Sequence, residues 1–309
     1  MKIVFMGTPD FSVPSLHELI RAGHEILAVI SQPDKPKGRG KNMQFTPVKE
    51  AALEYGIPVY QPDKVSNPEF INQLKGWNPD IIVVIAFGQI LPREILDIPR
   101  FGCINVHASL LPAYRGAAPI QRVIMDGKKT AGVTTMFMSE GLDEGDMIDK
   151  IEIPIEDKET YGSLHDKLSL AGARLLLVTL DKLEKGEAAR TVQDSSVSNY
   201  AKMIHKQTGH IDFTDSAETI ERLIRGLNPW PSAYTKLDGK NLKIWDAVVL
   251  DDEYPGIPGE IVELTDKSLY VKTGRGTLSI TSLQMEGKKK MNTNDFLRGY
   301  KVIKGTVLG

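Results

Sequence analysis

The sequence has little cysteine, little net charge and no long apolar run. Its 309 residues include one cysteine, Cys103, so no intramolecular disulfide can form and a reducing compartment is favoured. The formal net charge is −2, so a polyanionic partner must be bound by a local basic patch. No apolar run reaches the ~20 residues that span a bilayer, and the start MKIVFMGTPDF is typical of a strand rather than a signal peptide. We therefore expect a cytoplasmic protein.

Several catalytic signatures are also missing. No G-x-G-x-x-G follows the first apolar segment, which argues against a nicotinamide enzyme. No G-x-S-x-G elbow surrounds Ser109, which argues against a serine hydrolase. No cluster of His, Cys and carboxylate residues has the spacing of metal ligands, so no metal is expected.

Apolar segments alternate with helical patterns through the first part of the chain. Strands are predicted over residues 3–6, 25–30, 58–60, 81–86, 103–107, 133–138 and 147–154, with helices that begin at Ser12, Pro47, Pro68, Pro119 and Thr160. Uninterrupted apolar strands between helices are typical of a parallel sheet covered on both faces. The pattern predicts a doubly wound, Rossmann-like α/β domain with a mostly parallel sheet, which binds its ligands at the carboxyl ends of the strands.

The second part of the chain has a different pattern. Residues 186–206 are polar and aperiodic, as in a linker, and a helix is predicted over 216–225. Five short strands follow over 233–237, 242–250, 259–264, 269–272 and 277–284, with a hairpin turn at Asp238-Gly239. This spacing predicts an OB-like β-barrel. The expected boundaries are 1–188 for the catalytic domain, 189–206 for the linker and 207–309 for the barrel domain.

The stretch from Phe101 to Asp146 contains the candidate chemistry. Asn105, His107 and Ser109 share one face of the predicted strand at 103–107, because alternate strand residues point the same way. Asp143 lies in an acidic loop between glycines. A carboxamide, an imidazole and a carboxylate can stabilise an oxyanion and move protons. On residue types alone, a hydrogen-bonded core pair and an ordinary turn explain the pattern equally well.

Three motifs in this stretch together resemble the folate-dependent formyltransferase superfamily. They are Asn105-x-His107, the run from Ser109 to Pro119 (SLLPAYRGAAP), and Leu142-Asp143-x-Gly145-Asp146. The combination is highly specific to the superfamily. It does not select the member, because sugar formyltransferases share much of it.

The resemblance implies roles for particular residues. It implies that Asn105, His107 and Asp143 are catalytic and that 10-formyltetrahydrofolate donates the formyl group. It also implies a folate pocket formed by Phe87, Gly88, Gln89, Ile90, Ser109, Leu110, Leu111, Pro112 and Ser139.

Two basic segments stand out against the near-neutral chain. Residues 33–49 carry five basic residues and one acid, and residues 267–304 carry nine basic residues and two acids. Such a run is more often a solvated loop than a binding site. However, the GRGK letters at 38–41 resemble the superfamily members that act on initiator methionyl-tRNA. This resemblance implies tRNA binding by Lys35, Lys37, Arg39 and Lys41. The basic edge at 267–304 has the charge that phosphate binding needs, so tRNA binding is also expected at Lys288, Lys289 and Lys290.

Two alternatives stay open at this point. Another folate-dependent transferase or a formyl-folate hydrolase would need no tRNA-sized basic surface. A non-catalytic RNA-binding protein could keep the fold without turnover. A monomer is favoured, although nothing in the sequence decides the oligomeric state.

Overall fold

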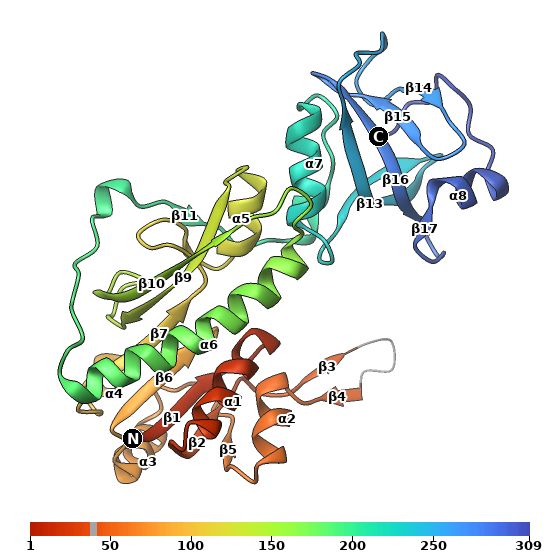
Figure 1. Cartoon of the computed structure of the whole chain (residues 1–309). Coiled ribbons are helices and arrows are strands. Elements are labelled where there is room, and N and C mark those ends of the chain that lie inside the picture. The colour runs from red at the N-terminus through yellow and green to blue at the C-terminus, as the bar shows by residue number, and fades with distance from the viewer. Residues whose placement is uncertain (38–41) are drawn as a thin grey trace. The chain divides into compact units, whose positions relative to one another are not determined.

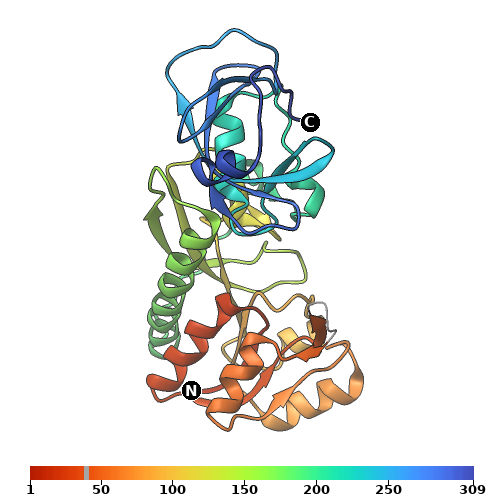
Figure 2. The same ribbon diagram turned by 90° about the vertical axis from the view of Figure 1, so that its right-hand side faces the viewer.

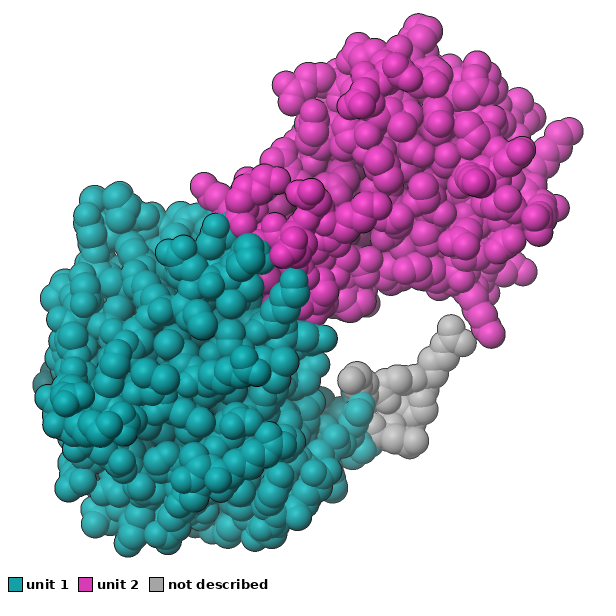
Figure 3. Space-filling model, viewed as in Figure 1, with its two compact units in different colours: residues 1–119, 130–154, 165–201 teal, residues 120–129, 155–164, 202–309 magenta. Residues whose placement is uncertain are grey.

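The computed structural model describes residues 1–37 and 42–309, which form two compact units (Figure 3). Unit 1 contains residues 1–119, 130–154 and 165–201, and unit 2 contains residues 120–129, 155–164 and 202–309. Residues 189–201, part of the predicted linker, therefore belong to unit 1. The predicted boundaries at 188 and 206 are those of domains that fold independently. A division into compact units does not test independent folding, so these boundaries stay a prediction.

A seven-stranded sheet forms the centre of unit 1 (Figure 1). Its strands, in spatial order, are β10 (Met147–Pro154), β9 (Thr130–Phe137), β7 (Cys103–His107), β6 (Ile81–Ile85), β1 (Lys2–Gly7), β2 (Glu25–Ile30) and β5 (Val59–Tyr60). The strands from β7 to β5 pair in parallel, and β9 and β10 add antiparallel pairs at one edge. This arrangement confirms the predicted α/β fold with a mostly parallel sheet.

Helices and short elements connect these strands. The helical segments of this part of the chain are η1 (Asp10–Ser12), α1 (Val13–Arg21), α2 (Pro47–Glu54), α3 (Pro68–Trp77), α4 (Arg93–Leu96), α5 (Pro119–Met125) and α6 (Tyr161–Lys185). The short strands β3 (Lys35–Lys37), β4 (Asn42–Gln44), β8 (Arg115–Gly116) and β11 (Tyr200–Ala201) were not predicted. A strand of two or three residues is too short to show an alternating pattern.

The sheet is buried between helices, as its sequence requires. All five side chains of β6 are buried, because an apolar strand in a parallel sheet has a helix layer on each side. On one face, Phe70 and Leu74 of α3 join a cluster with Val4 and Ile82. On the other face, α6 lies along the sheet (Figures 1 and 2) so closely that a Cβ on Gly172 would stand 3.0 Å from Val106.

Helix starts follow the predicted chemistry with one correction. Asn67 accepts a hydrogen bond from the Glu69 N–H at 2.9 Å and caps α3, which Pro68 opens. Ser12 was predicted to cap the first helix. It occupies the cap position of α1, but its hydroxyl donates to the Ile85 carbonyl at 2.7 Å instead. A buried hydroxyl must find a partner, and here it is the carbonyl at the end of β6.

Unit 2 is built on antiparallel strands. Their order is β12 (Ala233–Leu237), β13 (Lys240–Leu250), β16 (Thr277–Met285), β15 (Leu269–Lys272) and β14 (Ile261–Leu264), with β17 (Met291–Asn292) added on β16. Helix α7 (Ala217–Gly226) packs against β13, and its Ile220 and Ile224 enter the unit's apolar core. The structure confirms the predicted OB-like β domain. It adds α8 (Thr293–Gly299) and the 3-10 turn η3 (Lys206–Gly209) in unit 2 and the 3-10 turn η2 (Ser195–Val197) in unit 1, none of which was predicted.

Candidate active site

The candidate catalytic groups converge at the carboxyl end of β7. Asn105 and His107 are two residues apart on this strand, so both side chains emerge on the same face. The Asn105 carboxamide donates from Nδ2 to Oδ1 of Asp143 at 3.3 Å. The structure thus brings together three residues that lie up to 38 positions apart in the sequence.

His107 is held by backbone on one side and faces the carboxylate on the other. Its side chain is 8% exposed. Nε2 lies 3.0 Å from the carbonyl oxygen of Tyr114, and a carbonyl can only accept, so Nε2 carries a proton. Nδ1 lies 3.6 Å from Oδ2 of Asp143, beyond hydrogen-bond length. The ring is therefore fixed with Nδ1 directed toward the acid.

Asp143 sits in a strained backbone conformation. Its φ is +54°, a left-handed value that non-glycine residues adopt at a cost of about 1–3 kcal/mol. Its Oδ2 accepts a hydrogen bond from the Gly116 N–H at 2.8 Å. Glycine is required two positions later, because a Cβ on Gly145 would lie 1.8 Å from the Phe137 carbonyl oxygen. The loop is thus held in one shape by contacts on both of its flanks.

Two residues that the sequence analysis missed support this loop. The Gln193 side chain, which is buried, donates from Nε2 to the carbonyl oxygens of Asp143 and Gly145, both at 2.8 Å. The buried Arg115 guanidinium donates from Nε to Oε1 of Gln193 at 3.0 Å. Arg115 lies in the SLLPAYRGAAP run, but no role was predicted for it. Gln193 had no sequence signal, because it lies in the polar segment interpreted as a linker.

The segment around Gln193 is paired at both ends to segments next to the candidate site. Thr191 and Met147 exchange two backbone hydrogen bonds of 2.9 Å. At the other end, Tyr200 and Ala201 of β11 pair in parallel with Arg115 and Gly116 of β8. Residues 191–201 therefore form an ordered strap over the site, and we call them the 191–201 strap.

The predicted folate residues 87–90 follow β6, at the carboxyl end of the strand that pairs with β1. The Phe87 side chain is buried in the core, and its carbonyl accepts a hydrogen bond from the Thr8 hydroxyl at 3.1 Å. Gly88 is exposed with φ +88°, and Ile90 is 69% exposed. The Gln89 amide is occupied by the 62–65 loop, since its Oε1 accepts from the Val65 N–H at 2.9 Å. This edge thus presents the backbone of Gly88 and the exposed apolar residue Ile90.

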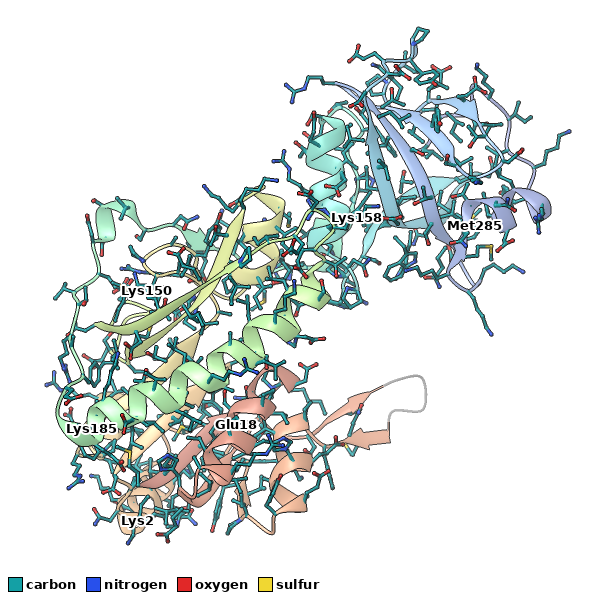
Figure 4. The ribbon with its side chains drawn as sticks, viewed as in Figure 1. Lys2, Glu18, Lys150, Lys158, Lys185 and Met285 are labelled. Atoms are coloured by element: carbon teal, nitrogen blue, oxygen red, sulfur yellow. The ribbon has the colours of Figure 1, made fainter. Side chains whose placement is uncertain are left out.

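The remaining predicted folate residues belong to the turn after β7 and to the loop before Asp143. The Ser109 hydroxyl donates to the Ala113 carbonyl at 2.7 Å, so it fixes the turn. Leu110 packs near Gly132, and Leu111 is buried with Met136 and Met147. The ammonium of Lys150, labelled in Figure 4, donates to the Leu111 carbonyl, and burial lowers the pKa of this lysine. Pro112 and Ser139 are half-buried.

The predicted tRNA-binding residues lie in two places. In unit 1, Lys35 is exposed on β3, whereas Arg39 and Lys41 lie outside the described residues and Lys37 is described for its backbone only. In unit 2, Lys288, Lys289 and Lys290 are exposed in the turn between β16 and β17.

An aromatic ring that the sequence analysis missed lies beside the second set. The Lys290 ammonium lies 5.1 Å from the centre of the Trp245 ring, and Lys243 approaches the same ring at 5.6 Å. Ammonium groups around a tryptophan suit a phosphate next to a stacked base.

The side chains of Asn105, His107 and Asp143 indicate chemistry at an acyl carbon. Among residues 1–37 and 42–309 no group of three His, Cys or carboxylate side chains could hold a metal ion. In the same ranges no helix combines the length and apolarity needed to cross a membrane. The Asn105 carboxamide, the His107 ring and the Asp143 carboxylate instead fit a carbonyl carbon whose oxygen becomes charged during the reaction.

Comparison with known proteins places the chain in a family. The family models for the formyl transferase and for the formyl transferase C-terminal domain match residues 1–180 and 203–301, and the chain belongs to this family. It is 55% identical over 306 residues to the methionyl-tRNA formyltransferase of Agathobacter rectalis, covering 99% of each chain. It is 51% identical over 309 residues to that of Clostridioides difficile, covering 100% of each chain.

A solved structure shares the fold at low identity. HypX from Aquifex aeolicus in complex with tetrahydrofolic acid matches 99% of this chain with a TM-score of 0.65 and 20% identity. The chain spans 50% of that protein's length. The match supports the fold.

Proposed function

We propose that this chain transfers the formyl group of 10-formyltetrahydrofolate to the amino group of methionine on initiator tRNA. The observation that carries the chemistry is the convergence of Asn105, His107 and Asp143 at the end of β7. The acceptor is indicated by relatives of matching length, which are named methionyl-tRNA formyltransferase at about half identity. The product serves the initiation of translation.

Asn105 and His107 stabilise the charge that develops on the formyl oxygen. When bound, the folate supplies the formyl carbon that the free amine attacks. One N–H of the Asn105 amide reaches Asp143, and its second N–H is the donor for the oxyanion. In the protonated ring of His107, Nε2–H stays on the Tyr114 carbonyl, so Nδ1–H is the second donor.

Asp143 moves the proton. An α-amino group titrates near 8, so a useful neutral fraction exists at pH 7 without a strong base. The attacking nitrogen loses one proton as its bond to carbon forms, and the folate nitrogen gains one as its bond to carbon breaks. Asp143, beside His107 and anchored by the Gly116 N–H, relays that proton through water.

The folate pocket is assigned to the edge formed by residues 87–90, 109–112 and Ser139. The fit rests on accessible backbone at Gly88, where a Cβ would meet nothing closer than 3.9 Å, and on the exposed side chain of Ile90. Backbone N–H and C=O groups can form hydrogen bonds with the edge of a flat heterocycle, and the Ile90 side chain can pack against its face. The carboxyl ends of β1 and β6 are where an open α/β sheet binds its ligand.

Acceptor binding is assigned to two basic surfaces. Residues 35–41 contact the acceptor end, and Lys288, Lys289 and Lys290 with Trp245 contact the phosphate backbone. The chain has net charge −2, so these local surfaces must provide the attraction. The enzyme acts as a cytoplasmic monomer without a metal in this proposal.

The test is incubation of the purified protein with 10-formyltetrahydrofolate and charged initiator tRNA, scored for formyl-methionine. The expected result is formylation that requires both substrates. Formate release at the same rate without tRNA would instead identify a formyl-folate hydrolase. Absence of any folate turnover, with tRNA binding retained, would identify a non-catalytic RNA-binding protein.

A further inference from the structure

We propose that Gln193 is a positioning residue for the formyl transfer, which holds the Asp143 loop in its reactive shape. The inference rests on the proposed function. The Gln193 amide nitrogen has two N–H groups, and each is directed at one loop carbonyl, that of Asp143 and that of Gly145. A single side chain thereby fixes the backbone on both sides of Glu144.

The loop needs this support because its central residue is strained. Asp143 has φ +54°, a conformation that persists only where the surroundings enforce it. Gly116 and Asn105 bind the Asp143 carboxylate, but neither contacts its backbone carbonyl. The Gln193 contacts act on the backbone and set the direction from which the side chain leaves it.

Gln193 is itself oriented by charge. Its Oε1 accepts a hydrogen bond from Arg115 Nε at 3.0 Å, which leaves the amide nitrogen directed at the loop. Arg115 Nη2 donates to the Ser195 hydroxyl at 3.3 Å, and Nη1 lies 3.5 Å from the Glu144 carboxylate. Arg115 and Gln193 therefore connect the strap, the turn after β7 and the acidic loop in one network.

Backbone pairing at both ends of the 191–201 strap fixes the position of Gln193 along the chain. Thr191 is paired to Met147 on one side of the loop, and Tyr200 is paired to Arg115 on the other. Gly116 has φ +105°, and a Cβ there would stand 2.3 Å from the Tyr200 ring, so strap and turn are in close contact. The strap functions as part of the catalytic unit.

A positioning role predicts a loss in the chemical step and not in acceptor binding. The Gln193→Met variant keeps the side-chain volume and removes both N–H donors. The expected result is a decrease of about 10–100-fold in the single-turnover rate, since a misplacement of ~1 Å can cost that much, with tRNA affinity within twofold of wild type. Hydrogen exchange of residues 139–146 should become faster.

Coupling to Asp143 separates positioning from general support of the fold. In an Asp143→Ala background, Gln193→Met should lower the residual rate by less than twofold, because a residue that acts through Asp143 has nothing left to position. The matched control is Val178→Ala on α6, a residue outside the strap that is 49% exposed, and it should leave rate and exchange unchanged. Gln193→Glu keeps the contact to Arg115 and should also slow the chemical step, because a carboxylate would face two carbonyls.

The outcomes are distinct. If the wild-type protein does not formylate the tRNA, the proposed function fails. If the wild type is active and folded Gln193→Met retains the wild-type single-turnover rate, the positioning role is wrong. An equal rate loss in the wild-type and Asp143→Ala backgrounds overturns it too, and so does unchanged exchange of residues 139–146.

Discussion

The backbone N–H of Gly116 donates a hydrogen bond of 2.8 Å to Oδ2 of Asp143. The same carboxylate oxygen lies 3.6 Å from Nδ1 of His107. A backbone donor has no rotamer freedom, so the acid is placed by the turn after β7 rather than by another flexible side chain. The turn motif and the acidic loop, separated in the sequence, therefore act on one atom.

This geometry predicts the effect of removing each catalytic group. Asn105→Ala, His107→Ala and Asp143→Ala should each lower turnover at least about a hundredfold, the usual cost of losing an oxyanion donor or a proton-transfer group. Folding and tRNA binding should persist. The measurement is single-turnover formylation beside a binding titration. The control Asp157→Ala removes a carboxylate that is 95% exposed and should keep the wild-type rate. Near-normal turnover in any folded variant would remove that residue from the mechanism.

The two basic surfaces should respond differently to salt. Arg39→Ala should cost about 1–3 kcal/mol in productive tRNA use, comparable to one good nucleic-acid contact, because a guanidinium binds phosphate or stacks on a base. Replacing Lys288, Lys289 and Lys290 with serine should weaken binding broadly and flatten its salt dependence by a slope of up to about one per lost phosphate contact. Affinity measured across a salt series separates the two. Unchanged affinity and rate in Arg39→Ala would leave residues 38–41 without a role in tRNA use.

The single thiol should be inert in the folded protein. Cys103 is 3% exposed, and burial raises the pKa of its thiol to about 12, so almost no thiolate forms at pH 8. Alkylation by iodoacetamide at pH 8 should therefore be slow in buffer and fast in guanidinium chloride. The readout is intact mass over time, with the denatured sample as the control. Stoichiometric labelling of the native protein within minutes would contradict the burial of β7.

A partly buried histidine should make stability depend on pH. The Asp10 carboxylate, 3.6 Å from Nε2, raises the pKa of His165, and Asp166 adds to the shift while burial opposes it. The charged ring therefore stabilises the fold fully below the ordinary histidine pKa of about 6.5, and this contribution disappears as pH rises through the raised value. His165→Gln should lower the melting temperature more at pH 6 than at pH 9.

A second histidine provides the control of opposite sign. Burial lowers the pKa of His24. Its contribution to the free energy of unfolding is therefore present above the ordinary histidine pKa, where the ring is neutral, and is lost as pH falls and the ring must become charged in a partly buried place. His24→Gln should therefore cost less at pH 6 than at pH 9. An identical pH trend for the two variants would contradict both assignments.

Local pattern was sufficient for most of the fold. The strand predicted at 103–107 matches β7 residue for residue, because its apolar run is bounded by a glycine before it and a turn after it. The strand predicted at 147–154 matches β10 in the same way. The mostly parallel pairing followed from the alternation of strands and helices, whereas the order of strands in the sheet was not predicted. The short pairs β3–β4 and β8–β11 were missed because their partners, and not their own letters, make them strands.

Sequence reasoning could predict only those parts of the site in which the type of side chain itself indicates the chemistry. Asn105, His107 and Asp143 were predicted from their side-chain types and motifs, and the structure shows that they lie together. The Gly116 N–H could not be foreseen as a ligand of the carboxylate, since any residue has one. Gln193 was hidden for a different reason, because its partners are two carbonyls some fifty positions away.

The pairing of β11 with β8 bears on how such chains can be recombined. Thr191, Gln193 and Tyr200 come after the apparent end of the catalytic domain, yet they complete the surroundings of Asp143. A chimera joined near residue 188 would combine one parent's acidic loop with the other parent's strap. The contacts between this loop and this strap would then come from two different proteins. A junction after Ala201 transfers loop and strap together. The unit that is inherited intact is therefore longer than the α/β domain that the sequence outlines.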